Sequence, residues 1–511
     1  MKSWRPDVTA ALVSIAVFVA IIAAVVFSSS GGRTSGRAAP ATLPSEQAQQ
    51  PAPGGSVRSF QLSAGPATLE LRPGLQVLVW AYNGSVPGPE LRVKVGDLVR
   101  VQFTNNLPAG TTIHWHGLVV PNGQDGVAGV TQDVIPSGGM ATYAFAAATA
   151  GTYWYHPHQD SALQEDRGLY GALIVDPRDG ISAPTLDQTL IYDEWTLGSA
   201  QATPPPGDDA TMVIYGTYSV NGRTGDGILP IRFQSGTTVR LRLINAGSLT
   251  HYIHVRGVPV RIVAADGHEL IGGPPTEHAV AIGAGERIDV EFTAPSSSVW
   301  VQAHDPSAPA TQIGVPFLPV GAPLPTQMPG RNESISGQLL DLLNYPARAE
   351  SPVWPDGSTA TRSFTLSLNE AMSAMSDQRF GMPGMAGMQT QYRINGSSFP
   401  NTQPLEVTQG DLVSLTIENR GRLEHPMHFH GGAFEIVARD GQPTAGQLVK
   451  DTVLVEPGES ITIGFRADNR GWWMLHCHEL HHAAGGMDTL LYYAGSDRLA
   501  SLGGSYGNSP E

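Results

Sequence analysis

Residues 476–487 gather several soft metal ligands in one short stretch, His-Cys-His-Glu-Leu-His-His-Ala-Ala-Gly-Gly-Met. Cys477 is the only cysteine in 511 residues, so it cannot form a disulfide within the chain. Side chains alternate along a β-strand, so His476 and His478 would share one face and the Cys477 thiolate would occupy the other. Two imidazoles, a thiolate and a weak axial methionine, here Met487, form the ligand set of a blue copper centre. The stretch therefore predicts two metal sites joined by one strand. The alternative is a structural cysteine among surface histidines.

The pattern His-x-His occurs four times along the chain. The motifs are His114-Trp-His116, His156-Pro-His158, His428-Phe-His430 and His476-Cys-His478. In a strand each motif places two imidazoles on one face, which gives eight in all. Imidazole binds copper, iron, nickel and zinc, so the motifs alone do not identify the metal. The soft thiolate of Cys477, together with His425, His482 and Met487, indicates copper.

The composition favours turn-rich β-structure as the framework for these residues. Fifty-nine Gly, 40 Pro and 15% charged residues are typical of β-domains rather than helical bundles. The length is that of about three domains. From Phe60 onward, short alternating runs are broken by Gly and Pro, as in the strands of a β-sandwich. The net charge of −15 argues against nucleic acid as a partner.

A repeat in three copies explains where the histidines fall. Each copy begins with Asn-Gly, continues through a strand that ends in Asn, and finishes at the pattern His-x-x-Gly. The copies span residues 83–117, 221–257 and 395–431, and copies one and three share a closing strand at 151–158 and 471–478. We therefore predict three Greek-key β-sandwich domains at residues 57–180, 181–330 and 362–500, with a linker at 331–361.

The second copy lacks most of the ligands. It keeps His251 and His254 but has Arg256 in place of the third histidine, and its closing strand, residues 300–304, has neither Cys nor His-x-His. We expect His251, His254 and His304 to be structural and this domain to be a spacer without a copper site. The first and third domains must then face each other across the histidine cluster.

The order of these motifs resembles that of the three-domain multicopper oxidases, the superfamily of laccases and bacterial cuprous oxidases, over residues 60–495. The resemblance implies cupredoxin-like domains and four copper ions per chain. It implies that His425, Cys477, His482 and Met487 bind type 1 copper, and that His114 and His428 bind type 2 copper. It assigns the type 3 pair to His116, His156, His158, His430, His476 and His478.

The resemblance also implies an activity. Single electrons from a reductant would enter at type 1 copper and pass through Cys477 to its flanking histidines, and O2 would be reduced to water at the cluster. Asp125 falls where relatives carry a carboxylate that could relay protons, although an Asp before Gly126 also suits a turn. The spacing from His478 favours His482 over His481 as the ligand. Ala483 stands where some bacterial relatives have an acidic residue.

A methionine-rich segment bears on the substrate. Five of the 12 methionines fall within 17 residues, among Gly and Pro: Met372, Met375, Met382, Met385 and Met388. Thioethers select Cu(I), whereas a methionine stripe could instead fill a core. We favour a Cu(I) oxidase in copper tolerance. The alternatives are a laccase that oxidises small phenols and a copper-free scaffold protein of the same fold.

The amino-terminal residues suggest export. Lys2 and Arg5 precede an uncharged apolar run from Val8 to Phe27, which is long enough to span a bilayer. We favour an uncleaved signal-anchor helix at residues 1–27 over a cleaved signal peptide. Residues 28–56 lack large apolar groups and predict a flexible linker. We therefore expect a monomer held outside the cytoplasm by a membrane anchor.

Overall fold

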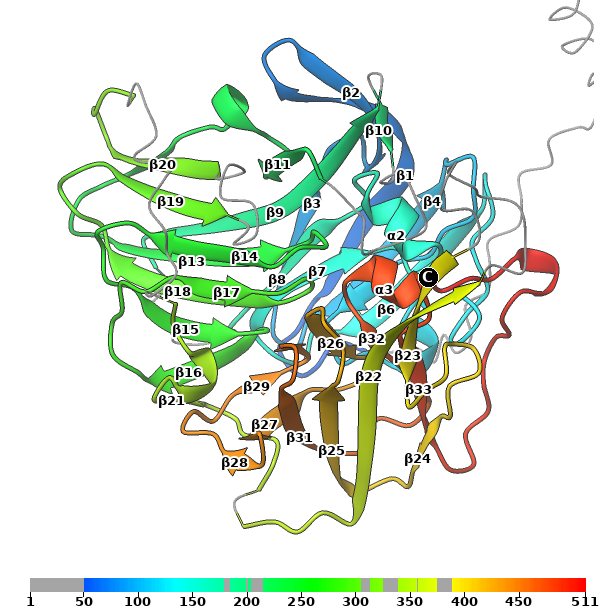
Figure 1. The fold of residues 1–511 in the computed structure, drawn as a ribbon. Helices are drawn as coiled ribbons and strands as arrows, with labels where there is room; N and C mark the ends of the chain where they lie inside the picture. The colour runs from blue at the N-terminus through cyan, green and yellow to red at the C-terminus, as the bar shows by residue number, and fades with distance from the viewer. Residues whose placement is uncertain are drawn as a thin grey trace, which may run out of the picture. The chain divides into compact units, whose positions relative to one another are not determined.

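The computed structural model describes residues 50–178, 184–198, 201–203, 215–304, 313–324, 339–355, 357–374 and 388–511. These residues form an all-β structure with two short helices, α2 (Ser161–Glu165) and α3 (Leu480–Ala484), which lie against each other (Figure 1). The expected membrane anchor and most of the expected linker after it lie outside the described residues. Within the described part, no helix has both the length and the apolar character that a membrane span requires.

The first sandwich packs two sheets around Trp115, Tyr155 and Phe103, all fully buried. One sheet contains β1 (Val57–Arg72), β2 (Leu75–Tyr82), β4 (Leu98–Asn105) and β6 (Met140–Ala146). The other contains β3 (Gly88–Lys94), β8 (Gly171–Asp176), β7 (Gly151–His156) and β5 (His114–His116). The first histidine motif makes up β5, and the second begins at His156, the last residue of β7. These two strands pair side by side.

The second sandwich is built in the same way. One sheet contains β9 (Leu186–Gly198), β11 (Thr217–Val220), β13 (Thr238–Asn245), β15 (Arg261–Ala265), β16 (His268–Gly272), β18 (Arg287–Thr293) and β21 (Ala347–Ala349). Strand β10 (Gln201–Thr203) pairs with both β9 and β2, so this sheet and the β1–β2–β4–β6 sheet of the first sandwich form one 12-stranded sheet. The other sheet of the second sandwich contains β12 (Ile231–Phe233), β14 (His251–Val255), β17 (Val280–Ile282), β19 (Val299–His304) and β20 (Ile313–Pro319). Strand β21 lies within the expected linker but pairs with β16, so this stretch is packed onto the sandwich.

The third sandwich follows the same plan. One sheet contains β22 (Arg362–Ala374), β23 (Met388–Ile394), β25 (Leu412–Asn419), β27 (Phe434–Arg439), β28 (Gln442–Pro443), β29 (Val449–Lys450) and β31 (Ser460–Arg466). The other contains β24 (Leu405–Val407), β26 (His425–Phe429), β30 (Thr452–Val455), β32 (Trp472–Cys477) and β33 (Asp488–Tyr493). The other two histidine motifs begin on β26 and β32 and end one residue after each strand. These strands pair with each other as β5 and β7 do.

Each copy of the sequence repeat forms the same turn and the same pairing of strands. Asn83, Asn221 and Asn395 have φ of 50°, 49° and 52°, and the glycine after each also has positive φ. Two successive positive φ values make a type I′ turn, which Asn-Gly adopts readily. The first strand of each sandwich then runs parallel to the strand that ends in Asn, in the pairs β1–β4, β9–β13 and β22–β25.

A buried asparagine ends one strand in each copy of the repeat. Asn105, Asn245 and Asn419 each donate two hydrogen bonds of 2.7–2.9 Å to backbone carbonyls and accept one from the amide two residues ahead. Each side chain thus satisfies three backbone groups that would otherwise be buried without a partner. These asparagines fix the segment that leads into the histidine-bearing strands β5, β14 and β26.

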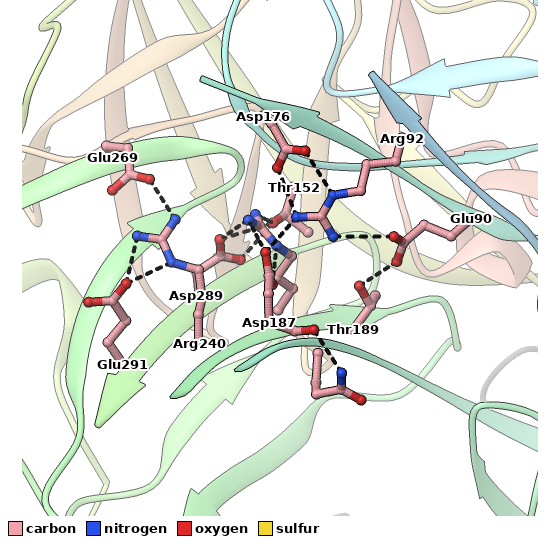
Figure 2. A network of polar contacts seen from close by, with 12 residues as sticks. Glu90, Arg92, Thr152, Asp176, Asp187, Thr189, Arg240, Glu269, Asp289 and Glu291 are labelled. Carbon is pink, nitrogen blue, oxygen red and sulfur yellow. Dashed lines mark hydrogen bonds and ion pairs between the residues drawn. The ribbon is translucent and has the colours of Figure 1, made fainter. Parts of the chain in front are cut away.

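The sandwiches contact one another through apolar and charged surfaces. Trp154, Trp195 and Ile244 belong to a buried cluster shared by the first and second sandwiches. Beside it, Figure 2 shows a polar network in which Arg92 binds Asp176 and Asp187, and Thr152 binds Asp289. Arg242 joins Asp187 to Asp289. A smaller apolar cluster, Val127, Val130, Met474 and Leu490, links the first sandwich to the third.

Replacing Asn245 by Ala tests the role of the buried asparagines. The change leaves two carbonyls and one amide without partners, so we expect the free energy of unfolding of the second sandwich to fall by about 2–4 kcal/mol. Calorimetric unfolding of the full chain measures this loss. The control is Asn221→Gly at the exposed turn, which keeps the positive φ. It also loses two hydrogen bonds, to the Ile191 amide and the Thr189 carbonyl, but these are less buried, so it should cost less than Asn245→Ala. Equal losses in the two variants would contradict this role.

Candidate metal centres

The strand β32 (Trp472–Cys477) supplies ligand atoms to different groups on its two faces. The Cys477 Sγ lies with His425 and His482, whereas His476 lies with His158 and His430. The residue after the strand, His478, lies with His116 and His156. The separation that the side-chain alternation predicts is therefore present in the structure.

The cysteine group consists of His425, Cys477 and His482, which are buried and bring a sulfur and two ring nitrogens together. The Cys477 Sγ lies 3.6 Å from Nδ1 of His425 and 3.6 Å from Nδ1 of His482, and the two nitrogens are 3.2 Å apart. The other ring nitrogens of these histidines face Glu370 at 3.2 Å and Glu479 at 3.3 Å. Because a carboxylate only accepts hydrogen bonds, those outer nitrogens carry the protons and both Nδ1 atoms point lone pairs at the sulfur. Two imidazole lone pairs and a sulfur atom that face one another suit a cation between them.

Local structure explains how this group is held. Glu479 caps α3 by accepting a hydrogen bond of 2.7 Å from the backbone N–H of His482. After the helix the chain turns back, and backbone bonds join Met487 to His482 and to Cys477, each 3.0 Å long. Met487 is fully buried in the same cluster as Cys477. Burial raises the pKa of the Cys477 thiol, so its thiolate needs a cation beside it.

The eight histidines of the four motifs converge between the first and third sandwiches. Each is at most 2% exposed. Their ligand atoms form three groups in which every atom lies within 4.8 Å of the others: His114, His116 and His428; His116, His156 and His478; and His158, His430 and His476. Every group contains histidines from both sandwiches, so the cluster depends on their contact.

The outer ring nitrogens of seven of the eight histidines are bound to the protein, whereas neither ring nitrogen of His478 has a hydrogen-bond partner among the described residues. Backbone carbonyls accept from Nδ1 of five histidines at 2.8–3.1 Å: His114, His156, His158, His428 and His476. A carboxylate accepts from Nδ1 of His430 at 3.1 Å, and another from Nε2 of His116 at 3.2 Å. Metal-binding histidines characteristically donate their outer N–H in this way, which fixes the ring tautomer.

The inner ring nitrogens are left for a metal. Among the described residues, no hydrogen-bond partner reaches the inner nitrogens of six buried histidines: His114, His116, His156, His158, His428 and His478. The inner Nε2 atoms of His430 and His476 face each other at 3.2 Å, and both carry lone pairs because the outer nitrogens hold the protons. Burial is the main cause that lowers the pKa of seven of the eight histidines, namely His116, His156, His158, His428, His430, His476 and His478. Neutral imidazoles are the form that binds metal ions, so the cluster fits bound copper.

Asp125 lies inside the cluster and not only in a turn. Its backbone oxygen accepts from His114, and its carboxylate lies 3.3 Å from Nδ1 of His114 and 3.1 Å from Nδ1 of His430. It also ends a short 3-10 turn before Gly126, as the turn alternative expects. Its side chain joins a histidine of the first sandwich to one of the third.

Besides Asp125 and Glu479, four carboxylates contact histidines of the two groups, and the sequence did not single them out. Glu165 lies 2.5 Å from Nδ1 of His156, and Glu511 lies 3.4 Å from Nδ1 of His476. Asp451 contacts His116 and His428, and Glu370 contacts His425. A signal existed for Glu165 alone, because it follows a His-x-His motif closely in the sequence, as Asp125 does.

The remaining histidines have other partners. His481 points away from the cysteine group, and its Nε2 lies 2.9 Å from the Tyr215 hydroxyl and 3.3 Å from Asp166. In the second sandwich, His251 contacts Glu194 and His254 lies 2.8 Å from Gln302. The backbone of His304 ends β19, and its side chain lies outside the described residues.

Comparison with known proteins gives a consistent result. Family models described as multicopper oxidase match residues 65–180, 185–317 and 370–494. The chain is 30% identical to multicopper oxidase MmcO of Mycobacterium tuberculosis, covering 89% of this chain and 90% of that protein. It is 24% identical to copper resistance protein A of Escherichia coli (84% and 91% covered) and 28% identical to Laccase-2 of Botryotinia fuckeliana (85% and 81% covered).

The solved structures agree. The multicopper oxidase of Pseudomonas thermotolerans superposes with a TM-score of 0.68 at 28% identity, covering 86% of this chain and all of that one. Sequence, fold and the two histidine-rich centres thus lead to one assignment. The chain belongs to the multicopper oxidase family, and it is a copper-containing oxidoreductase that uses O2 as its electron acceptor.

Proposed function

We propose that this oxidase takes electrons from Cu(I) at the cysteine group and serves in copper tolerance. The observation that carries the proposal is the hairpin of β22 and β23. Its paired residues Glu370 and Tyr392 contact the two histidines of the cysteine group, and its far end leads into the methionine-rich segment. A laccase acting on small phenols is the second candidate, because the relatives include laccases as well as copper resistance proteins.

We assign the ligands as the motifs and the geometry favour. Type 1 copper takes His425, Cys477, His482 and Met487. Type 2 copper takes His114 and His428. The type 3 pair takes the two triads His116, His156, His478 and His158, His430, His476, which the structure brings together as groups. Copper, when bound, supplies the reversible one-electron chemistry that these side chains lack.

The chain's own residues then connect and serve the two centres. Cys477 is covalently continuous with His476 and His478, so electrons cross from one centre to the other through a few bonds of a single peptide. The reduction of O2 to water consumes protons, and Asp125 is the carboxylate we propose to relay them, since its side chain reaches histidines of both sandwiches. Packing on all sides keeps bulk water from the cluster.

The entry point for electrons is the cysteine group, and the charge beside it favours a cation over a neutral phenol as the substrate. Glu370 lies 3.2 Å from Nε2 of His425 and is partly exposed. Burial acts to raise its pKa, but hydrogen bonds from His425 and from the amides of Arg422 and Leu423 outweigh it and lower the pKa to about 2. The carboxylate is therefore negative at neutral pH and attracts Cu(I). The net charge of −15 acts in the same direction.

The hairpin brings the ends of the methionine-rich segment toward this entry point. Tyr392 stacks on His482 with ring centroids 4.3 Å apart. Ala374 pairs with Met388 four residues beyond the Glu370–Tyr392 pair, a distance of about 13 Å along a strand. Met375, Met382 and Met385 lie outside the described residues, and for Met372 and Met388 only the backbone is described. Their thioethers are the soft ligands that would capture Cu(I).

We also propose where the protein works. The basic and then apolar amino-terminal residues support a membrane anchor with the oxidase domains outside the cytoplasm. We retain the domain limits 57–180, 181–330 and 362–500, and a monomer as the working unit. The copper-free scaffold alternative has little support, because the full set of histidines and Cys477 is retained.

Two neighbouring histidines give a matched test of the type 1 assignment. We expect His482→Ala to lose the strong thiolate-to-copper absorption, because it removes one of two imidazoles beside the sulfur. His481→Ala should retain that absorption, because its ring binds Tyr215 and Asp166 instead. Visible absorption spectra of the copper-loaded variants measure the difference. The assignment is wrong if His481→Ala is bleached while His482→Ala stays blue.

The substrate proposal is tested by replacing Met375, Met382, Met385 and Met388 together by Leu. The change keeps the apolar volume and removes the soft sulfur ligands, so we expect kcat/KM for Cu(I) to fall at least tenfold while kcat/KM for a bulky phenol changes less than twofold. Oxygen uptake with each reductant provides the rates. An unchanged Cu(I) rate, or equal losses with both reductants, would favour the laccase alternative.

A further inference from the structure

The second sandwich was expected to be only a spacer, but one of its arginines reaches the histidine cluster. Arg287, the first residue of β18, is fully buried and forms a bidentate ion pair with Asp451 of the third sandwich. Both N–O distances are 2.6 Å, from Nη1 to Oδ1 and from Nη2 to Oδ2. We infer that Arg287 is a positioning residue for the oxygen-reducing cluster and acts through Asp451. This inference rests on the ligand assignment proposed above.

Asp451 connects this pair to two ligand histidines from different sandwiches. Its carboxylate lies 3.2 Å from Nε2 of His116 and 3.5 Å from Nδ1 of His428, and its backbone oxygen accepts from His428 at 2.9 Å. Thr452 bonds to the same carboxylate and lies within 3.2 Å of both rings. The two imidazoles stack with centroids 3.8 Å apart and planes 15° apart. Asp451 therefore fixes which nitrogen of each ring faces inward.

The second sandwich holds the backbone of Asp451 as well as its side chain. The Asp266 carboxylate accepts from the amides of Asp451 and Thr452 at 3.3 and 3.1 Å, and also from the amide of Arg287 at 2.8 Å. The guanidinium of Arg287 also donates to the backbone oxygen of Thr152 in the first sandwich at 3.2 Å. All three sandwiches thus meet at one buried carboxylate.

Two glycines keep space for this arrangement. Gly117, directly after His116, has φ +85°, and a Cβ there would lie 2.2 Å from Nη2 of Arg287 and 2.6 Å from Oδ2 of Asp451. Gly285, two residues before Arg287, has φ +82°, and a Cβ there would lie 2.8 Å from the His478 ring. The backbone of the second sandwich therefore forms part of the wall of the cluster.

The contacts explain why an arginine is needed. Only a planar guanidinium matches both oxygens of a carboxylate while donating to a third acceptor, whereas the Lys ammonium acts as a point charge on a shorter reach. Without the pair, the Asp451 carboxylate is free to rotate away from His116 and His428. Outer partners of metal-binding histidines of this kind typically contribute about 10–100-fold to metal affinity.

Arg287→Lys tests the inference, with Arg242→Lys as the matched control. Arg242 is also buried, also binds a carboxylate with two nitrogens, at 2.8 and 2.9 Å to Asp187, and also joins two sandwiches through Thr152. Among the described residues, the hydrogen-bond and ion-pair partners of Arg242 include no histidine of the cluster. The readouts are copper per chain at a buffered free-copper level that just fills the wild-type protein, the type 2 EPR signal, and the melting temperature of the metal-free protein.

We expect the melting temperature to fall in both metal-free variants. In Arg287→Lys alone, the type 2 signal should fall by about two- to tenfold at this copper level, as a loss of about 10–100-fold in affinity implies, while the type 1 absorption is kept. Full copper and an unaltered type 2 signal in Arg287→Lys would overturn the inference. So would equal copper loss in Arg242→Lys, or an Arg287→Lys protein that binds no type 1 copper, since the pair would then serve the fold alone. If the wild-type protein shows no type 2 signal, the ligand assignment fails instead.

Discussion

The alternation of side chains at the end of β32 is the constraint on which both metal centres depend. Because neighbouring side chains in a strand point to opposite faces, His476 and Cys477 serve different centres although one peptide bond joins them. One face of β32 must therefore meet His425 of β26 within the third sandwich, and the other face must meet histidines of the first sandwich. Greek-key pairing and the three buried asparagines provide that placement.

In the histidine cluster, seven of the eight rings have one nitrogen bound to the protein and the other turned inward, His478 being the exception among the described residues. Eight imidazoles buried together would repel if protonated, and burial keeps them neutral by lowering the pKa of most of them. Carbonyls and carboxylates on the outside fix the tautomers, so that the lone pairs point inward. The same rule applies at the cysteine group, where Glu370 and Glu479 occupy the outer positions. The site is thus arranged for cations before any bind.

The histidines and the cysteine that the structure groups together were predictable from the sequence, whereas most of the residues that hold them were not. Short spacings in strands fix the side that a histidine faces, so His-x-His and the sequence around Cys477 can be interpreted locally, and the Asn-Gly turns gave the repeat. Glu370 reaches its histidine from the opposite sheet of the third sandwich, Asp451 lies between β29 and β30, and Arg287 comes from another sandwich. Nothing in the local sequence separates them from ordinary surface charges, because their role depends on long-range packing. Asp125 was recognised because it falls nine residues after His116, where relatives carry a carboxylate.

The central claim is that one sulfur atom joins the reductant to the oxygen-reducing cluster. Cys477→Ser tests it most directly, with absorption, copper content and reductant-driven oxygen uptake measured on one sample. The account predicts that the strong visible absorption and the oxygen uptake both disappear, while the copper held by the eight histidines remains. Survival of either the absorption or the uptake would contradict it.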